Sequence, residues 1–194
     1  MDNRPIPETA RFLIIRRDNI GDLVCTTPMI RALRQRFPKA RIGVLVTSYN
    51  RQVVEHNPDI DVVYAYMKAK HRDPGQGVLG VYWRRLRLML ELRRQRFDYA
   101  IIGGATFLRR ALRLARMIRP RHIVGFTEPG KRGVRHIDVG VPYTRPHPMH
   151  EVEDIFRLLA PLGIQGPPPP MRVYPPATSL AQVDAAFREK HLPR

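Results

Sequence analysis

The chain has 194 residues, 43% of them hydrophobic, which suits one soluble domain with a real core better than two domains. It contains no apolar run near the roughly 18–20 residues of a membrane-spanning helix, and residues 1–10 lack the apolar segment of a secretory signal. The net charge of +17 predicts a polyanionic partner, namely nucleic acid, an anionic membrane or a phosphorylated substrate, although a genome rich in Arg codons is an alternative cause.

Strand-like and helix-like segments alternate along the chain. Short apolar strands are predicted at residues 11–15, 41–46, 61–64, 99–102 and 122–124. Helices are predicted at residues 24–37, 49–56, 78–95, 106–118, 150–162 and 180–190. Strands separated by helices predict a Rossmann-like α/β fold, with a parallel sheet and helices on both faces.

Two stretches interrupt this alternation. Residues 127–149 are rich in Gly, Pro, His and basic side chains, and we expect a long irregular segment that is either functional or mobile. Residues 167–170 are consecutive prolines, which predict a stiff spacer. We therefore assign residues 1–166 to one Rossmann-like domain and residues 167–194 to a linker and a helix that lead toward a second domain.

The helix expected at residues 78–95 is amphipathic by its spacing. Its predicted buried stripe consists of Leu79, Tyr82, Leu86, Met89 and Leu90. The arginines of residues 84–96 and 109–121 fall mostly on outward faces. These faces are either solvated or adhere to anionic lipid head groups, and both interpretations stay open.

The loop after the first strand carries the candidate chemistry. Asp22 follows Gly21 at the exit of a buried strand, where open α/β sheets bind their ligands. Its carboxylate could accept a proton from an alcohol as a general base, or it could cap the next helix. Because Gly21 stands alone, without the G-x-G-x-x-G pattern, a nucleotide site is not expected here. Cys25, the only cysteine, is expected to be a small buried side chain in a reducing, cytosolic setting.

The run from Phe12 to Pro28, with its Gly21-Asp22 pair and its Thr-Pro helix start, resembles the opening of the family 9 glycosyltransferases. These are the heptosyltransferases of lipopolysaccharide core assembly. Residues 97–102 and 150–163 are similar to the family's fourth strand and to the helix that closes its N-terminal domain. The resemblance implies the N-terminal, acceptor-binding half of a GT-B glycosyltransferase, whose C-terminal donor-binding domain is absent from this chain.

The resemblance also implies a reaction. We expect an inverting, metal-independent transfer of a sugar, heptose from ADP-heptose, to a lipopolysaccharide core or related glycolipid. Asp22 would be the catalytic base, and the transfer needs no cofactor. The histidines show no metal-ligand spacing with cysteine or carboxylate partners. Without the donor half, this chain is expected to be inactive by itself.

Further residues are expected to bind the acceptor. They are Arg16, Asn19, Gly21, Thr26, Lys68, Lys70, Arg72 and His150. The basic loop that holds Lys68, Lys70 and Arg72 would grip phosphate or carboxylate groups, with a solvated loop as the alternative. His150 enters through the resemblance, and a helix cap is its alternative role.

The transferase interpretation predicts a cytoplasmic protein in peripheral contact with the inner face of the inner membrane. Its partners would be a nucleotide-sugar donor and an anionic glycolipid. A non-enzymatic binder of nucleic acid or anionic lipid is the main alternative, motivated by the charge. No recognised nucleic-acid motif appears, so nucleic acid is not the expected partner. A truncated or split gene product that folds without activity is a third possibility.

Overall fold

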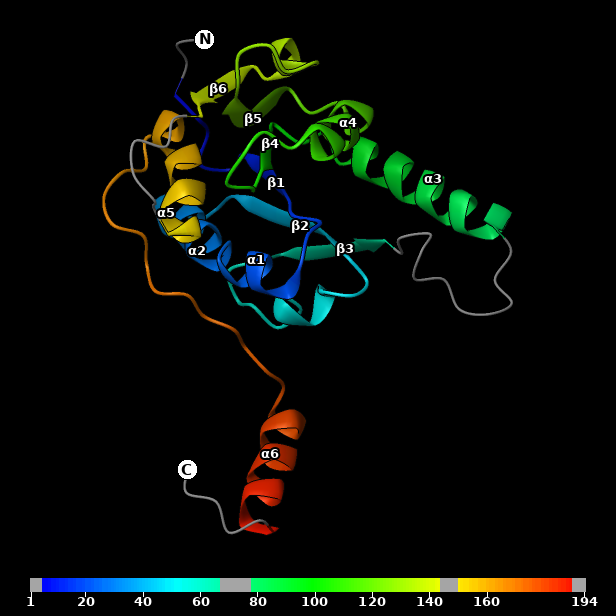
Figure 1. Cartoon of the computed structure of the whole chain (residues 1–194), viewed down its shortest axis with the longest axis vertical. Coiled ribbons are helices and arrows are strands. Elements are labelled where there is room, and N and C mark those ends of the chain that lie inside the picture. The colour runs from blue at the N-terminus through cyan, green and yellow to red at the C-terminus, as the bar shows by residue number, and fades with distance from the viewer. Residues whose placement is uncertain (1–4, 67–77, 144–149, 190–194) are drawn as a thin grey trace.

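The structure, a computed structural model, describes residues 5–66, 78–143 and 150–189. It contains one parallel sheet in the order β3-β2-β1-β4-β5-β6 (Figure 1). The strands are β1 (Arg11–Ile15), β2 (Arg41–Thr47), β3 (Val62–Tyr66), β4 (Tyr99–Ile102), β5 (His122–Thr127) and β6 (Val139–Pro142). The predicted fold class, a parallel sheet with helices on both faces, is confirmed.

The central strands are buried on both faces, as a covered parallel sheet requires. In β1 every residue after Arg11 is buried. Phe12 and Ile14 belong to one apolar cluster, whereas Leu13 and Ile15 belong to the other. The alternation of side chains along a strand therefore divides the core into two layers.

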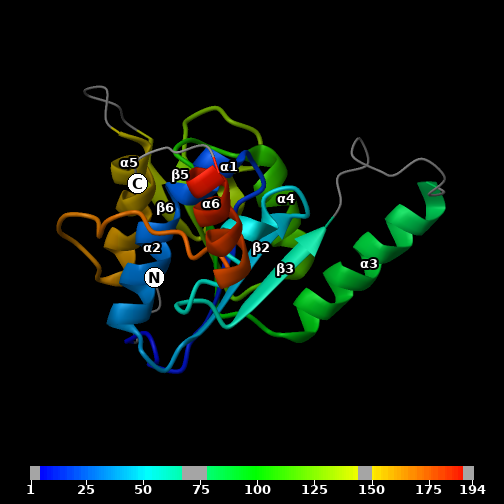
Figure 2. The same ribbon diagram turned by 90° about the horizontal axis from the view of Figure 1, so that it is seen from below.

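Different helices cover the two faces of the sheet (Figure 2). The helices α2 (Thr27–Arg36) and α5 (Glu151–Phe156), with the 3-10 helix η4 (Arg157–Leu162), pack in the layer of Phe12. The helices α3 (Val78–Arg94) and α4 (Arg109–Ile118) pack in the layer of Leu13. Helices on both faces are the arrangement that right-handed crossovers produce.

The helix predicted at residues 24–37 is confirmed as α2, although it begins only at Thr27, and the sequence did not reveal a separate short helix before it. A short helix, α1 (Ile20–Val24), precedes α2. Pro28 lies in the first turn of α2, where its missing N–H costs nothing because no helical carbonyl would accept from it. The fixed φ of proline also favours a helix start at this position. The Thr27 hydroxyl donates to the carbonyl of Val24 at 2.8 Å and fixes the break between the helices.

The helix predicted at residues 49–56 is only a 3-10 turn, η1 (Arg51–Val53). The side-chain oxygen of Asn50 accepts hydrogen bonds from the amide and the hydroxyl of Thr47, at 2.9 and 2.8 Å. Asparagine side chains commonly bond nearby backbone groups in this way and stabilise a turn in place of a helix.

The irregular segment predicted at residues 127–149 contains two elements that periodicity did not reveal. They are the 3-10 helix η3 (Val134–His136) and the edge strand β6. In β6, Val139 and Val141 are buried while their neighbours are exposed, which is the period-two pattern of a strand. Four residues that include Gly and Pro are too few for that pattern to be distinctive in sequence.

The predicted buried stripe of α3 is partly wrong. Met89 is buried, as expected, but Leu86 and Leu90 are each 46% exposed. The side chains of Leu79 and Tyr82 lie outside the described part of the chain. The inward face instead presents Met89 and Leu92, and the start of α3 projects beyond the sheet (Figure 1).

The last helix, α6 (Ala177–Glu189), stands apart from the sheet and its covering helices, which form the body of the protein (Figure 1). None of its described residues is buried. It follows the proline-rich segment, which runs as an extended strap over the surface. Among the helices that the structure describes, none is both long enough and apolar enough to span a bilayer.

Candidate active site

The candidate site lies at the point where the strand order of the sheet reverses. The strands β1 and β4 are neighbours, and each is followed by a loop at the carboxyl edge of the sheet. Open α/β sheets bind ligands in the crevice at this switch point. The loop after β1 holds Arg16 to Asn19 and leads into α1, and the loop after β4 begins with Gly103 and Gly104.

Arg16 lies at the centre of this site and is only 2% exposed. Its guanidinium donates to the carbonyl oxygen of Gly103 and, at 2.5 Å, to a carboxylate oxygen of Glu151. The same group lies 3.3 Å from Asp22 Oδ1 and 3.6 Å from Asp18 Oδ2. Arg16 therefore lies beneath the rim and joins the loops after β1 and β4 to the start of α5.

Asp22 lies at the rim, with 23% of its side chain exposed. Its Oδ2 atom accepts a hydrogen bond from the backbone amide of Asn19 at 2.8 Å, while Oδ1 faces Arg16. The capping role is thus observed, because a carboxylate near a helix start satisfies a free amide. The carboxylate nevertheless remains at the surface, at the edge where a ligand would bind.

The other residues proposed from the first loop differ in their surroundings. Asn19 and Gly21 are exposed, and a Cβ atom at Gly21 would meet no atom within 4 Å. Thr26 is fully buried, and its hydroxyl donates to the carbonyl of Asp22 at 2.9 Å. The open backbone at Gly21 can approach a ligand, whereas Thr26 supports the loop from below.

Glu151 is the site residue that sequence reasoning missed. It is the first residue of α5, and its side chain is 33% exposed where it contacts Arg16. Acidic residues are common in a first helical turn because they interact favourably with the helix dipole. For that reason no signal in the sequence separates Glu151 from its acidic neighbours.

His150 is the N-cap of α5 and is exposed. Its Nδ1 atom accepts a hydrogen bond from the amide of Val152 at 3.2 Å, which is the capping role. It directly precedes Glu151 and so lies near the same rim. Lys68, Lys70 and Arg72 lie outside the described residues.

Cys25 lies in the turn between α1 and α2 and is partly exposed. Burial raises the pKa of its thiol, and the nearby carboxylate of Glu151 raises it further, while Arg16 acts in the opposite direction. A raised pKa disfavours the nucleophilic thiolate. In residues 5–66, 78–143 and 150–189, no cluster of three or more His, Cys, Asp or Glu side chains could hold a metal ion.

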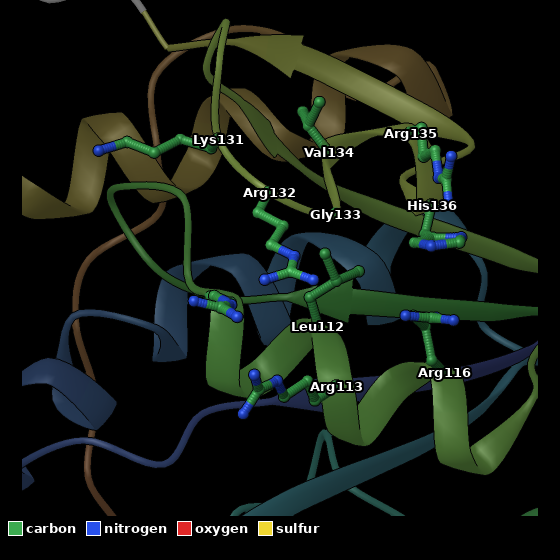
Figure 3. Close-up of a pocket in the computed structure, with 10 residues that line it drawn as sticks. Leu112, Arg113, Arg116, Lys131, Arg132, Gly133, Val134, Arg135 and His136 are labelled. Atoms are coloured by element: carbon green, nitrogen blue, oxygen red, sulfur yellow. The ribbon is translucent and has the colours of Figure 1, made fainter.

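A strongly cationic cavity of about 660 Å³ lies beside α4. Its charged and titratable lining consists of Arg109, Arg113, Arg116, Lys131, Arg132, Arg135 and His136. Figure 3 shows Arg116 pointing toward His136 and the side chain of Arg132 extending toward α4. Partial burial lowers the pKa of His136, and the charges of Arg116 and Arg135 lower it further. The cavity therefore favours an anion.

No family model matches the chain. Over 150 residues the chain is 28% identical to lipopolysaccharide heptosyltransferase 3 of Escherichia coli strain K12, a match that covers 74% of this chain and 40% of that protein. A family 9 glycosyl transferase of Veillonella parvula DSM 2008 superposes with a TM-score of 0.74 at 19% identity, over 95% of this chain and 51% of that chain.

Two heptosyltransferases of E. coli also share the fold. The ADP-heptose lipopolysaccharide heptosyltransferase II superposes with a TM-score of 0.66 at 16% identity, over 94% of this chain and 51% of that chain. The heptosyltransferase WaaC, solved with ADP-2-deoxy-2-fluoro heptose, gives a TM-score of 0.65 at 16% identity, over 83% of this chain and 51% of that chain.

The fold is thus that of one half of a GT-B glycosyltransferase. The matches confirm the resemblance to glycosyltransferase family 9 that the opening motif indicates. The chain spans 40% of the curated relative and about half of each of these solved structures.

Proposed function

We propose that this chain is the acceptor-binding half of a heptosyltransferase-type glycosyltransferase, with Asp22 as the general base. The observation that carries the proposal is the partly exposed carboxylate of Asp22 at the switch point of the sheet. The family resemblance, which places a catalytic aspartate at this position, supports the same role. A second domain, outside these 194 residues, would bind the nucleotide sugar, so the chain by itself would not complete the transfer.

The proposed chemistry is an inverting displacement. Asp22 removes the proton of an acceptor hydroxyl while the hydroxyl oxygen attacks the anomeric carbon of the donor. The new C–O bond forms on the face opposite the leaving nucleoside diphosphate, which departs with the electron pair of the broken bond. The proton ends on Asp22, and in this proposal the transfer needs no metal. Heptose, supplied as ADP-heptose, is the proposed sugar.

The neighbours of Asp22 would position it and the acceptor. Arg16 compensates the charge of the Asp22 carboxylate and orients its Oδ1 atom. Glu151 contacts the same guanidinium nitrogen of Arg16 as Asp22 does, and so limits its movement. The exposed Asn19, Gly21 and His150 are the proposed contacts for the acceptor. For the anionic part of the acceptor we retain the proposal of Lys68, Lys70 and Arg72.

The experiment compares Asp22→Asn with Asp18→Asn. Both residues lie near Arg16, at 3.3 and 3.6 Å, so each variant removes one carboxylate from the same cluster. With the donor domain supplied, on the same chain or as a second one, heptose incorporation into heptose-deficient lipopolysaccharide is measured. A lost general base lowers turnover by roughly 100- to 10,000-fold in Asp22→Asn. Asp18→Asn should stay within a few-fold of the wild type.

Binding of the acceptor to the chain alone, measured by calorimetry, provides the second arm. Asp22→Asn should still bind the acceptor, because the amide keeps the shape of the side chain. Unchanged turnover in Asp22→Asn would remove Asp22 from the base role. A chain that binds no acceptor would contradict the assignment as the acceptor half.

A second candidate function, non-enzymatic binding of a polyanion, is favoured by the cationic cavity beside α4. Its seven basic or titratable side chains would attract any phosphate-rich molecule. Such binding would weaken steeply with salt and would not depend on Asp22. Binding of a nucleic-acid oligonucleotide that is as tight in Asp22→Asn as in the wild type, without any transfer, would support this alternative.

The proposed transfer also defines the setting of the protein. An anionic glycolipid acceptor lies in a membrane, so we propose a cytoplasmic protein in peripheral contact with the inner face of the inner membrane. The nucleotide-sugar donor would be its soluble partner, and nucleic acid would not be a partner.

A further inference from the structure

The outward face of α3 carries a continuous apolar stripe. Trp83 is 70% exposed, and Leu86 and Leu90 are each 46% exposed. Their spacing of three and four residues places all three side chains on one side of the helix. An exposed apolar stripe of this kind, away from the core of the protein, indicates an interaction surface.

The stripe borders a hollow between α3 and α4, with a volume of about 790 Å³. Its apolar lining consists of Leu86, Met89, Leu90 and Met117, and its cationic lining consists of Arg93, Arg113, Arg116 and Arg119. Met117 is itself 50% exposed. Apolar side chains and guanidinium groups therefore share one surface, which we call the α3–α4 surface.

The charge on the α3–α4 surface is positive, and the positive charge extends beyond the hollow. Arg113 and Arg116 also line the cationic cavity beside α4, so the hollow and the cavity are neighbours that share two arginines. The sequence of α4 contains no acidic residue, and that of α3 contains only Glu91. The charge complements an anionic partner and repels a basic one.

We propose that the α3–α4 surface docks on an anionic phospholipid bilayer. Trp83 and the leucines would enter the boundary between head groups and acyl chains, where tryptophan is favoured. The arginines would pair with lipid phosphates while their alkyl stems cover apolar surface. A bilayer matches both halves of the surface, because nucleic acid would leave the leucines and Met117 without apolar contact.

This inference deepens the proposed membrane contact by identifying the surface that makes it. It does not depend on Asp22, because none of the residues of the α3–α4 surface is assigned to the reaction. Its test therefore needs only the chain and vesicles, and a failed test would leave the catalytic proposal unaffected.

Trp83 allows a direct test, because it is the single tryptophan of the chain and lies on the surface itself. Its fluorescence is followed while phosphatidylcholine vesicles, with or without phosphatidylglycerol, are added. We expect a blue shift and co-sedimentation only with the phosphatidylglycerol vesicles, and both should weaken as salt is raised. A blue shift with an oligonucleotide but not with vesicles would overturn the proposal in favour of nucleic acid.

Two variants separate the charge of this surface from the charge of the whole chain. Arg93→Gln with Arg119→Gln removes two charges from the hollow, and Arg172→Gln with Arg188→Gln removes two exposed charges elsewhere. The first pair should weaken vesicle binding by on the order of 30-fold, and the second should have a much smaller effect. Equal losses would mean that only the overall charge matters, which would overturn the proposal.

The apolar part of the α3–α4 surface is tested with a double variant, Leu86→Ser with Leu90→Ser. Both side chains are half exposed, so the variant should fold, as circular dichroism would show. It should lose vesicle binding even in low salt, where the arginines still act. Unchanged binding would mean that the stripe does not enter the bilayer.

Discussion

One guanidinium holds three carboxylates at the carboxyl edge of the sheet. Arg16 lies between Asp18, Asp22 and Glu151, and it is almost entirely buried. A buried guanidinium is stable only when anions and hydrogen-bond acceptors satisfy it. The three acids compensate the charge of Arg16, and Glu151 and the carbonyl of Gly103 accept hydrogen bonds from its terminal nitrogens, while among the described residues its Nε atom has only the ion-pair contact with Asp18. In return, Arg16 keeps like charges close together.

Removing this group should therefore destabilise the protein. Arg16→Met leaves three carboxylates facing one another without their shared counter-charge. Since these carboxylates remain partly exposed, we expect the free energy of unfolding to fall by about 3 kcal/mol, near the lower end for a broken buried pair. Denaturant titration at neutral pH measures the loss.

The adjacent Arg17 provides the control. It contacts the hydroxyl and the ring of Tyr66 and is only partly buried. Arg17→Met should lower the free energy of unfolding by less than about 1 kcal/mol, which is the usual size of a partly exposed charged contact. Equal losses for Arg16→Met and Arg17→Met would show that the carboxylate cluster does not depend on Arg16.

At the level of elements, the site depends on how α5 packs. This helix is only six residues long, and it places Glu151 against Arg16 because its other face is anchored in the core. Ile155 is fully buried there, in the same cluster as Ile30 and Leu33 of α2. Apolar contacts one helical turn away from Glu151 therefore hold its side chain against Arg16, although the two residues are far apart in the sequence.

Truncating this anchor should cost far more than truncating an exposed leucine. Ile155→Ala leaves a cavity in the core, so we expect a loss of about 2–5 kcal/mol in the free energy of unfolding. Leu90→Ala, on the exposed stripe of α3, should cost less than about 1 kcal/mol. Thermal and denaturant unfolding measure both, and a small effect of Ile155→Ala would contradict the packing of α5.

For the whole molecule, the body and the last helix are separate. The helix α6 buries none of its described residues, and the strap before it contributes a hydrogen bond from the amide of Arg172 to the hydroxyl of Thr27, at 3.1 Å. The apolar clusters of the body include Ile164 but no residue of α6. The body should therefore fold without the C-terminal segment.

A chain that ends at Pro170 tests this independence. We expect its free energy of unfolding to lie within about 1.5 kcal/mol of that of the 194-residue chain, since the loss is limited to exposed contacts and the hydrogen bond from Arg172 to Thr27. Denaturant titration of both chains makes the comparison. A loss of several kcal/mol would mean that α6 packs against the body.

Local sequence patterns were sufficient for most of the sheet. Apolar runs such as residues 12–15 specify buried strands, and the Gly21-Asp22 pair after the first of them places a carboxylate at the ligand edge, because strand exits meet there. The net charge of +17, which predicts an anionic partner, likewise follows from the sequence alone. The short strand β6 and the break before α2 escaped prediction, since each depends on a few residues.

Only the tertiary structure decided which surfaces are covered and which distant residues meet. Glu151 reaches Arg16 across 135 positions, a contact that no local pattern encodes. Leu86 and Leu90 have the spacing of a buried stripe, yet they are half exposed and line the open hollow between α3 and α4. Periodicity shows that a helix has an apolar face, but the packing of the whole chain determines what covers that face.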